Sequence, residues 1–201
     1  MTTSRGDYFE RKAGGYLEAS RKGLWGRFKA AEWRAVRECL DLAPGMSVLD
    51  AGCGAGYYSL RMRGEAGADI SGFDPSPAMI KAYRAQGFEG QVGRAETFGS
   101  GRRYDRILLA GVLEFIVSPD AALKNLAGLL RGGGRLVCLV PEAGLPGLVY
   151  KAVHSFWNCP AEVRDASFYL RLAGSAGLKI VRSVRTVPVS RTFALQRERY
   201  G

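Results

Sequence analysis

A glycine-rich turn between a short apolar strand and a helix is the feature that most limits the possible folds. Residues 47–50 are typical of a buried strand, the turn is Gly52-Cys-Gly-Ala-Gly56, and a helix is expected from residue 57 to 63. Three glycines within five residues let the backbone turn sharply and bring bare peptide against a ligand. The pattern therefore predicts a strand–loop–helix unit with a ligand beside the loop.

The rest of the chain repeats this alternation of strands and helices. Further strands are expected at residues 69–74, 90–93, 104–111, 134–140, 178–184 and 186–195, and further helices at 28–40, 75–85, 119–130, 148–157 and 164–173. The last two strands have almost no link between them, which permits only an antiparallel pair. The expected fold is α/β: a doubly wound, mostly parallel seven-stranded sheet with helices on both faces and an antiparallel edge strand. Ligands bind beyond the carboxyl ends of the strands in such sheets.

The composition is that of a folded chain of ordinary domain size. The 201 residues are 47% hydrophobic, and no uncharged apolar run approaches the length of a membrane span. The N-terminus shows no secretory signal, so a cytoplasmic location is expected. The four cysteines form no C-x-x-C pair and only one histidine is present, so no metal site is predicted.

An acidic residue 20 positions after Gly54 points to a nucleoside ligand. Asp74 ends the strand that follows the glycine turn, where a carboxylate can accept both ribose hydroxyls. The dinucleotide pattern G-x-G-x-x-G places Tyr57 at its third glycine, and the charge of Asp50 would repel a pyrophosphate. The residues therefore favour a nucleoside with cationic groups, and an NAD-dependent oxidoreductase is disfavoured.

Several motifs resemble those of one family. Residues 48–56 (VLDAGCGAG) resemble the first motif of class I S-adenosylmethionine-dependent methyltransferases of the small-molecule type, similar to the ubiquinone and menaquinone biosynthesis group. Residues 72–79 and 109–115 are similar to the second and fourth motifs, and the turns at 129–136 and 173–178 to those before the fifth and sixth strands. The resemblance covers about residues 46–195. It implies S-adenosyl-L-methionine as cofactor and S-adenosyl-L-homocysteine as product.

The resemblance also implies where the cofactor lies. Asp74 would hold the ribose, Met79 would pack near the adenine, and the backbone at Ala110 would face the methionine moiety. The expected cofactor-binding residues are Asp50, Gly52, Cys53, Gly54, Gly56, Asp74, Pro75, Met79, Ala95, Glu96 and Ala110.

Two positions depart from the family pattern. Arg94 stands where the family often has the aspartate that accepts from the adenine amino group, so Glu96 would have to substitute or the affinity would be lower. Phe115 stands where a histidine often follows the Leu-Glu pair of the fourth motif, which leaves an aromatic wall.

The resemblance places the substrate region in the N-terminal segment and in the insertion after the fifth strand. Tyr8 and Tyr16 resemble an aromatic lid, although packing of a helix onto the domain explains them as well. His154 lies one helical turn after Tyr150, and both are candidate catalytic residues, with His154 as general base. A structural histidine fits the same position, and methyl transfer needs alignment more than a catalytic side chain. The expected substrate-binding residues are Tyr8, Tyr16, Phe115, Tyr150 and His154.

The charge of the chain leaves the partner open to interpretation. The net charge is +10, with the excess concentrated in residues 147–201. Basic stretches are commonly solvated faces and no RNA-recognition motif is present, so a nucleic-acid partner is not expected. Trp25, Phe28 and Trp33 lie among basic residues and could line an apolar tunnel or touch a membrane surface, but nothing further supports peripheral membrane contact.

Together these patterns predict one methyltransferase domain over residues 1–201. It would comprise an N-terminal helical lid (1–45), a cofactor-binding half (46–141), and substrate-side helices with the final strand pair (142–201). The expected reaction moves a methyl group to an O, N or C acceptor on a small, partly apolar molecule. The alternatives are an S-adenosylmethionine-binding protein without turnover and an RNA methyltransferase.

Overall fold

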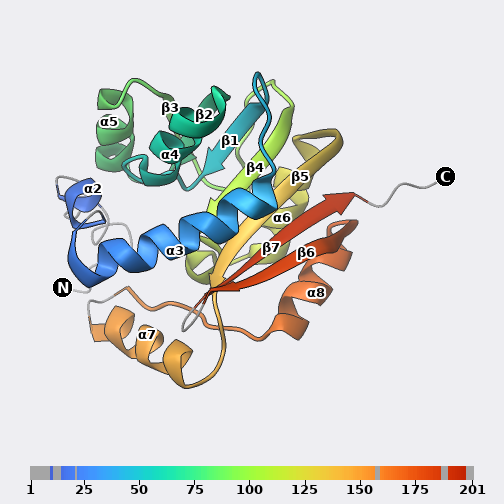
Figure 1. Ribbon diagram of the computed structural model, residues 1–201. Coiled ribbons are helices and arrows are strands. Elements are labelled where there is room, and N and C mark those ends of the chain that lie inside the picture. Colours follow the sequence, from blue (N-terminus) through green and yellow to red (C-terminus); the bar gives the residue numbers. More distant parts are fainter. Residues whose placement is uncertain (1–9, 11–14, 21, 157–158, 187–189, 198–201) are drawn as a thin grey trace.

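A seven-stranded sheet runs through the protein in the order β3-β2-β1-β4-β5-β7-β6 (Figure 1). The computed structural model describes residues 10, 15–20, 22–156, 159–186 and 190–197. The strands are β1 (Ser47–Ala51), β2 (Asp69–Asp74), β3 (Glu89–Val92), β4 (Tyr104–Ala110), β5 (Leu130–Pro141), β6 (Leu178–Thr186) and β7 (Ser190–Arg197).

Strands β1 to β5 are parallel, and β7 is antiparallel to both of its neighbours, β5 and β6. The predicted fold class is confirmed, with the antiparallel pair β6–β7 at one edge of the sheet. Strand β1 leads toward β2 on one side and β4 lies on its other side, so the strand order reverses between β1 and β4. The carboxyl ends of these two strands are where an open α/β sheet binds its ligand.

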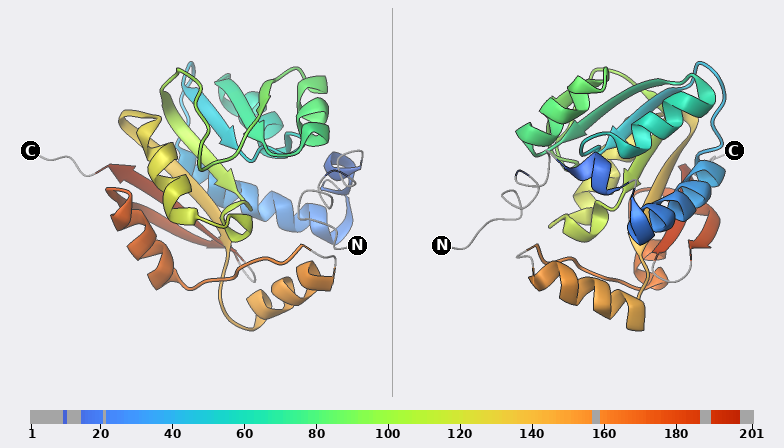
Figure 2. Two further views of the ribbon diagram at one scale, coloured as in Figure 1. Left: turned by 180° about the vertical axis from the view of Figure 1, so that it is seen from behind. Right: turned by 60° about the vertical axis from the view of Figure 1, so that its left-hand side comes forward.

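Helices cover both faces of the sheet (Figure 2). The helices are α2 (Tyr16–Ala19), α3 (Gly23–Leu40), α4 (Tyr57–Ala66), α5 (Pro77–Ala85), α6 (Pro119–Gly128), α7 (Leu145–Phe156) and α8 (Ala166–Ser175), with a 3-10 turn, η1, at Leu113–Phe115. Helices α3, α4 and α5 pack on one face, α6 and α8 on the other, and α7 lies beyond β5. No helix in the described ranges combines the length and apolar character of a membrane span.

The side-chain alternation of β4 explains why both faces carry a core. Leu108 packs with α3 residues such as Val36, whereas Ile107 and Leu109 pack with the α6 and α8 side. Successive side chains of a strand point to opposite faces, so a strand buried on both sides has a continuous apolar run. This is the reason that residues 104–111 were recognisable as a central strand.

A buried arginine joins α3 to the sheet at the end opposite the glycine turn. Helix α3 stops where Asp41 adopts a left-handed conformation with φ 49°. Arg106 of β4 donates from its Nε to the carbonyl of Leu40, and from Nη2 to the carbonyl of Asp41 at 3.1 Å. Carbonyls at the end of a helix have no partner within the helix, so the guanidinium satisfies them. Arg106 thereby sets the position at which α3 crosses β4.

We expect Arg106→Met to lower the free energy of unfolding by about 2–4 kcal/mol, because it leaves the buried carbonyl of Leu40 and the partly buried one of Asp41 without their charged donor. Urea unfolding followed by circular dichroism measures this. Arg103→Met, at an exposed position just before β4, is the matched control. Equal stability of the two variants would contradict the role given to Arg106.

Candidate cofactor and acceptor site

The glycine turn closes against the tip of β2. The amides of Gly52 and Cys53 both donate to the carbonyl of Phe73, at 2.8 and 3.0 Å. Gly52, Gly54 and Gly56 have φ values of 75°, 51° and 95°, a region that side chains rarely adopt. A Cβ added at Gly52 would lie 2.5 Å from Cγ2 of Val112, which follows β4. The turn therefore needs glycine both for its conformation and for its approach to β4.

Asp74 lies beside the turn, as the sequence predicts for a ribose ligand. Its Oδ2 accepts from the amide of Gly54 at 3.0 Å and its Oδ1 from the amide of Ser76 at 2.9 Å. Burial raises the pKa of Asp74, and the two amide donors act in the opposite direction. Each carboxylate oxygen can accept more than one hydrogen bond, so both remain able to receive ribose hydroxyls. The geometry suits a diol.

The residues expected at the adenine end follow β2 and β3. Met79 is buried in the first turn of α5, where its amide donates to the N-cap hydroxyl of Ser76 at 3.1 Å. Ala95 is buried, and its carbonyl accepts from Asn125 of α6 at 3.0 Å. Pro75 is exposed and Glu96 is half-buried. Arg94, the departure from the family pattern, is exposed.

Asp50 of β1 is the first member of a buried hydrogen-bond chain with Ser59 and Tyr83. Ser59 of α4 donates to Asp50 Oδ2 at 2.6 Å, and the Ser59 hydroxyl is 2.8 Å from the Tyr83 hydroxyl. Asp50 is 2% exposed, and burial raises its pKa to about 7 despite the hydrogen bond from Ser59. Asp50 thereby links β1 to α4, and its predicted contact with the cofactor stays a prediction.

Three of the predicted substrate residues come together beyond β4. The ring of His154 lies 4.4 Å from the ring of Tyr150 and 5.4 Å from that of Phe115, centroid to centroid. The Tyr150 hydroxyl donates to Glu114 Oε1 at 3.2 Å. Glu114 is 2% exposed, and burial raises its pKa to about 7. The sequence predicts no role for Glu114, although it is the acidic residue of the Leu-Glu pair in the fourth motif.

The N-terminal segment reaches the same end of the sheet. Glu10 Oε1 accepts from the Ser76 hydroxyl at 2.7 Å and lies 3.4 Å from the amide of Ala78. Tyr8 lies outside the described residues, and Tyr16 is the first residue of α2, with a side chain that is not described. Glu10 was not predicted, because nothing in its local sequence distinguishes it from other surface carboxylates.

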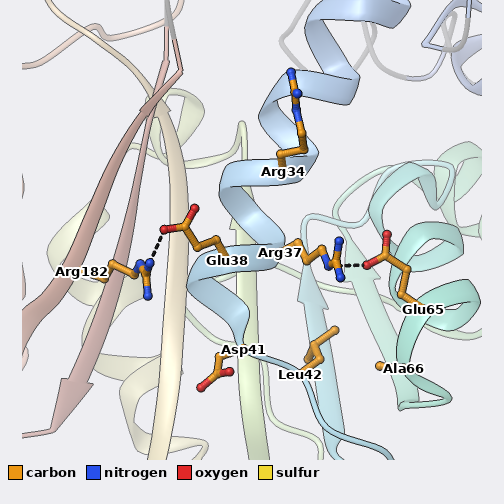
Figure 3. A pocket seen from close by; sticks show the side chains of 8 residues that line it. All are labelled: Arg34, Arg37, Glu38, Asp41, Leu42, Glu65, Ala66 and Arg182. Atoms are coloured by element: carbon orange, nitrogen blue, oxygen red, sulfur yellow. Dashed lines mark hydrogen bonds and ion pairs between the residues drawn. The ribbon is translucent and has the colours of Figure 1, made fainter.

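A groove lies between α3, α4 and β6, away from the glycine turn (Figure 3). It runs along the C-terminal ends of α3 and α4, at Asp41 and Ala66, which is the end of the sheet where β1 and β2 begin. Its arginines are largely balanced: Arg37 pairs with Glu65 at 2.7 Å, and Arg182 pairs with Glu38 (Figure 3). The groove offers no excess charge to an ionic ligand.

Comparison with known proteins decides the family. A family model described as a methyltransferase domain matches residues 25–182. The chain belongs to the methyltransferase domain family. The predicted class I S-adenosylmethionine-dependent methyltransferase and its cofactor are thereby confirmed.

Several curated relatives of this methyltransferase are named tRNA U34 carboxymethyltransferases. The chain is 32% identical over 192 residues to the tRNA U34 carboxymethyltransferase of Idiomarina loihiensis, covering 82% of this chain and 59% of the relative. The enzyme of the same name from Methylococcus capsulatus is 29% identical over 174 residues, covering 79% and 52%. This methyltransferase therefore spans little more than half the length of these relatives.

Solved structures share the fold at low identity. The putative methyltransferase of Haloferax volcanii in complex with the Trm112 activator has a TM-score of 0.78 at 17% identity, covering 94% of this chain and 98% of that one. The magnesium protoporphyrin IX methyltransferase of Synechocystis PCC 6803 with bound S-adenosylhomocysteine has a TM-score of 0.76 at 19% identity, covering 96% and 98%. These likenesses establish the fold.

The expectation that nucleic acid is not a partner is wrong. That expectation was based on the fact that most basic stretches in proteins are only solvated surface. The finding that overturns it is that relatives aligned with most of this chain are named as tRNA-modifying enzymes. The number of basic residues does not distinguish a surface that only faces solvent from one that binds phosphate, because both kinds of surface have the same composition.

The described residues fit S-adenosylmethionine. In the predicted arrangement the glycine turn would lie against the methionine end, Asp74 would offer carboxylate oxygens to the ribose, and the buried Met79 would be an apolar wall for the adenine. The cofactor supplies a methyl group on a positively charged sulfur, whose departure needs no further activation. The chain has to position the acceptor and receive its proton.

Asp74→Ala should weaken S-adenosylhomocysteine binding by about 2–4 kcal/mol, about 30- to 1000-fold in Kd, because it removes charge-assisted ribose contacts. Isothermal titration calorimetry measures the change. Asp69→Ala is the matched control, since Asp69 is exposed at the opposite end of β2 and pairs with Arg102. Unchanged affinity in Asp74→Ala would show that the site is elsewhere.

Asp50→Asn should make the stability less dependent on pH. The folded-state pKa of Asp50, about 7, lies above its ordinary value of 3.8, so the folded wild type loses stability as the pH rises from about 4 to 7. Asparagine accepts the same hydrogen bond from Ser59 without the buried charge. The variant should gain at most about 4 kcal/mol over wild type at high pH and less at low pH. Urea unfolding at about pH 5 and pH 8 tests this; a constant difference would contradict it.

Proposed function

We propose that this chain transfers a methyl group from S-adenosylmethionine to RNA, with tRNA as the substrate class. The observation that carries the proposal is the alignment of 82% of the chain with a relative named as a tRNA U34 carboxymethyltransferase. Membership of a methyltransferase family favours an enzyme over a protein that binds the cofactor without turnover. The proposal includes the cytoplasmic location that the sequence suggested, where tRNA is available.

Basic side chains surround the cofactor end of the sheet. Arg61 lies in the first turns of α4, Lys81 in those of α5, and Arg94 just after β3, and all three elements begin or end at the carboxyl ends of the strands. Arg27 lies in the first half of α3. The C-terminal end of α3 leads into the start of β1, so Arg27 lies toward the carboxyl ends of the strands. Lysine and arginine at such positions favour a phosphate backbone. Arg27, Lys81 and Arg94 are exposed.

The aromatic residues beyond β4 supply a surface for a nucleobase. A base must leave its stack before an enzyme can modify it, and aromatic side chains compensate by stacking on it. The neighbouring rings of Phe115, Tyr150 and His154 are of this type, and η1 and α7 hold them next to the end of β4. Methyl transfer then depends on alignment of the base with the cofactor.

A second candidate substrate is the small, partly apolar molecule expected from the sequence, with an O, N or C acceptor. The observation that favours it is the apolar character of α7, where Leu145, Leu148 and Val149 are 76%, 63% and 58% exposed. These side chains and the aromatic residues Tyr150 and His154 belong to the same helix. An apolar acceptor could therefore approach the site along α7.

Transfer of a tritiated methyl group from S-adenosylmethionine distinguishes the two candidates. Bulk tRNA prepared from cells that lack this protein should become labelled, and a panel of small apolar hydroxyl, amine and aromatic compounds should not. Labelling of the panel alone would favour the second candidate and overturn the first.

Substitution of the basic rim should weaken tRNA binding in a salt-dependent way. Arg27→Ala and Lys81→Ala should each lower the slope of log Kd against log salt concentration by about 1, because each removes a phosphate contact. Filter binding measures the slope. Arg171→Ala on α8 is the control, since Arg171 is exposed on the side away from the glycine turn and bonds to Ser167. An equal slope in all three variants would contradict the proposed RNA surface.

A further inference from the structure

We infer that Glu114 is the proton acceptor of the transfer reaction: its carboxylate receives the proton of the N–H or O–H group that is methylated, and Tyr150 positions it. The inference rests on the proposed function, because it assigns the chemistry of the acceptor at that same site. It replaces His154, the general base expected from the sequence, by a residue that the sequence analysis left without a role.

Glu114 lies immediately beyond the tip of β4. Its backbone carbonyl accepts from the amide of Glu162 at 2.8 Å, which fixes η1 against the segment before α8. A Cβ added at Gly111 would lie 3.7 Å from Glu114 Oε1, so the glycine leaves the carboxylate next to the bare peptide at the strand end. That peptide follows Ala110, the position expected to face the methionine moiety. The carboxylate is therefore at the switch between β1 and β4 where the ligand binds.

The two oxygens of Glu114 have different surroundings. Oε1 accepts from the Tyr150 hydroxyl at 3.2 Å, whereas Oε2 is buried and has no hydrogen-bond partner among the described residues. A buried carboxylate oxygen without a hydrogen-bond partner destabilises the folded protein, unless a bound ligand donates a hydrogen bond to it. Of the two buried carboxylates at the turn, Asp74 accepts from two backbone amides, and Asp50 accepts from the Ser59 hydroxyl. Among the described residues, Glu114 is the carboxylate that has a buried oxygen without a hydrogen-bond partner.

Burial is the main influence on the pKa of Glu114, because the charged groups around it largely cancel or are neutral. Lys29 and Glu32 of α3 form a buried ion pair at 2.9 Å, so their effects on Glu114 oppose each other. Cys138 of β5 and Tyr169 of α8 have raised pKa values and stay neutral at pH 7. The remaining titratable neighbours are on α7 and before α8: Tyr150, His154 in contact with it, and Glu162, whose side chain lies 3.9 Å from Lys151. A carboxyl group that titrates near neutral pH is suited to accept a proton.

The step balances with the groups named. Glu114 Oε2 accepts the proton that the acceptor nitrogen or oxygen loses as its bond to the methyl carbon forms, and the sulfur keeps the electron pair of the broken carbon–sulfur bond. Glu114 becomes a neutral carboxylic acid, which returns the proton to solvent after the product leaves. The acceptor is therefore a neutral N–H or O–H group, such as a base imide or a ribose hydroxyl. A ring nitrogen that becomes cationic on methylation would need no such residue.

Cofactor binding tests the position of Glu114 without any acceptor. S-adenosylmethionine carries a positive sulfur and S-adenosylhomocysteine does not, so only the former should favour ionised Glu114. Calorimetry at about pH 7 in buffers of different ionisation enthalpy should show that S-adenosylmethionine releases more protons, by up to about half a proton per site. Glu114→Gln should reduce this difference, and the control Glu162→Gln should keep it in full. An undiminished difference in Glu114→Gln would overturn the inference.

The pH dependence of single-turnover tRNA methylation tests the chemistry. The wild-type rate should rise with pH to a plateau above about pH 7, and Glu114→Gln should be at least about 100-fold slower, with unchanged S-adenosylhomocysteine affinity as evidence of folding. Tyr150→Phe should move the midpoint of the rise to higher pH, because it removes a hydrogen bond that favours the carboxylate. A pH-independent wild-type rate, or a Glu114→Gln rate close to wild type, would overturn the inference. If no tRNA is methylated, only the proposed substrate fails, and the proton-release experiment still decides on Glu114.

Discussion

The buried hydrogen-bond chain from Asp50 through Ser59 to Tyr83 is the interaction on which the cofactor end of the sheet depends. It joins β1, α4 and α5 behind the glycine turn. Tyr83 can occupy this place only because glycines face it: a Cβ at Gly72 would lie 2.8 Å from its hydroxyl, and one at Gly90 would lie 2.7 Å from its ring. The turn, two helices and three strands are therefore held in one arrangement, and a ligand meets a preformed surface.

The buried carboxylates of Asp50, within β1, and Glu114, beyond β4, show how burial can serve different purposes. Burial raises the pKa of both Asp50 and Glu114 to about 7. Asp50 is hydrogen-bonded within the protein. Its buried charge lowers the free energy of unfolding, whereas its hydrogen bond to Ser59 makes this end of the sheet more rigid. Glu114 shares only one oxygen with Tyr150, which leaves the other for chemistry. Hydrogen-bond partners, more than burial, separate the structural carboxylate from the reactive one.

Patterns close together in the sequence were predicted well. The glycine turn and Asp74 are separated by one helix, and strand–helix geometry alone brings them within hydrogen-bond distance, with 3.0 Å between Gly54 N and Asp74 Oδ2. Helix boundaries were predicted less well. Helix α3 begins at Gly23, five residues before the predicted start, because its first turn contains two glycines, which are weak helix formers. The nucleic-acid partner was missed, since composition does not show where basic residues gather.

The chain's local pattern was sufficient for the fold class, the cofactor loop and the ribose carboxylate, because glycine conformation and strand periodicity act over a few residues. Tertiary structure alone decided the acceptor side. Glu114 and Tyr150 are 36 residues apart and Glu10 and Ser76 are 66 apart, and their hydrogen bonds exist only because the tertiary structure brings α7 and Glu10 to the ends of the strands. Such contacts depend on the shapes of whole elements, and the same depth of burial sets the pKa of Glu114.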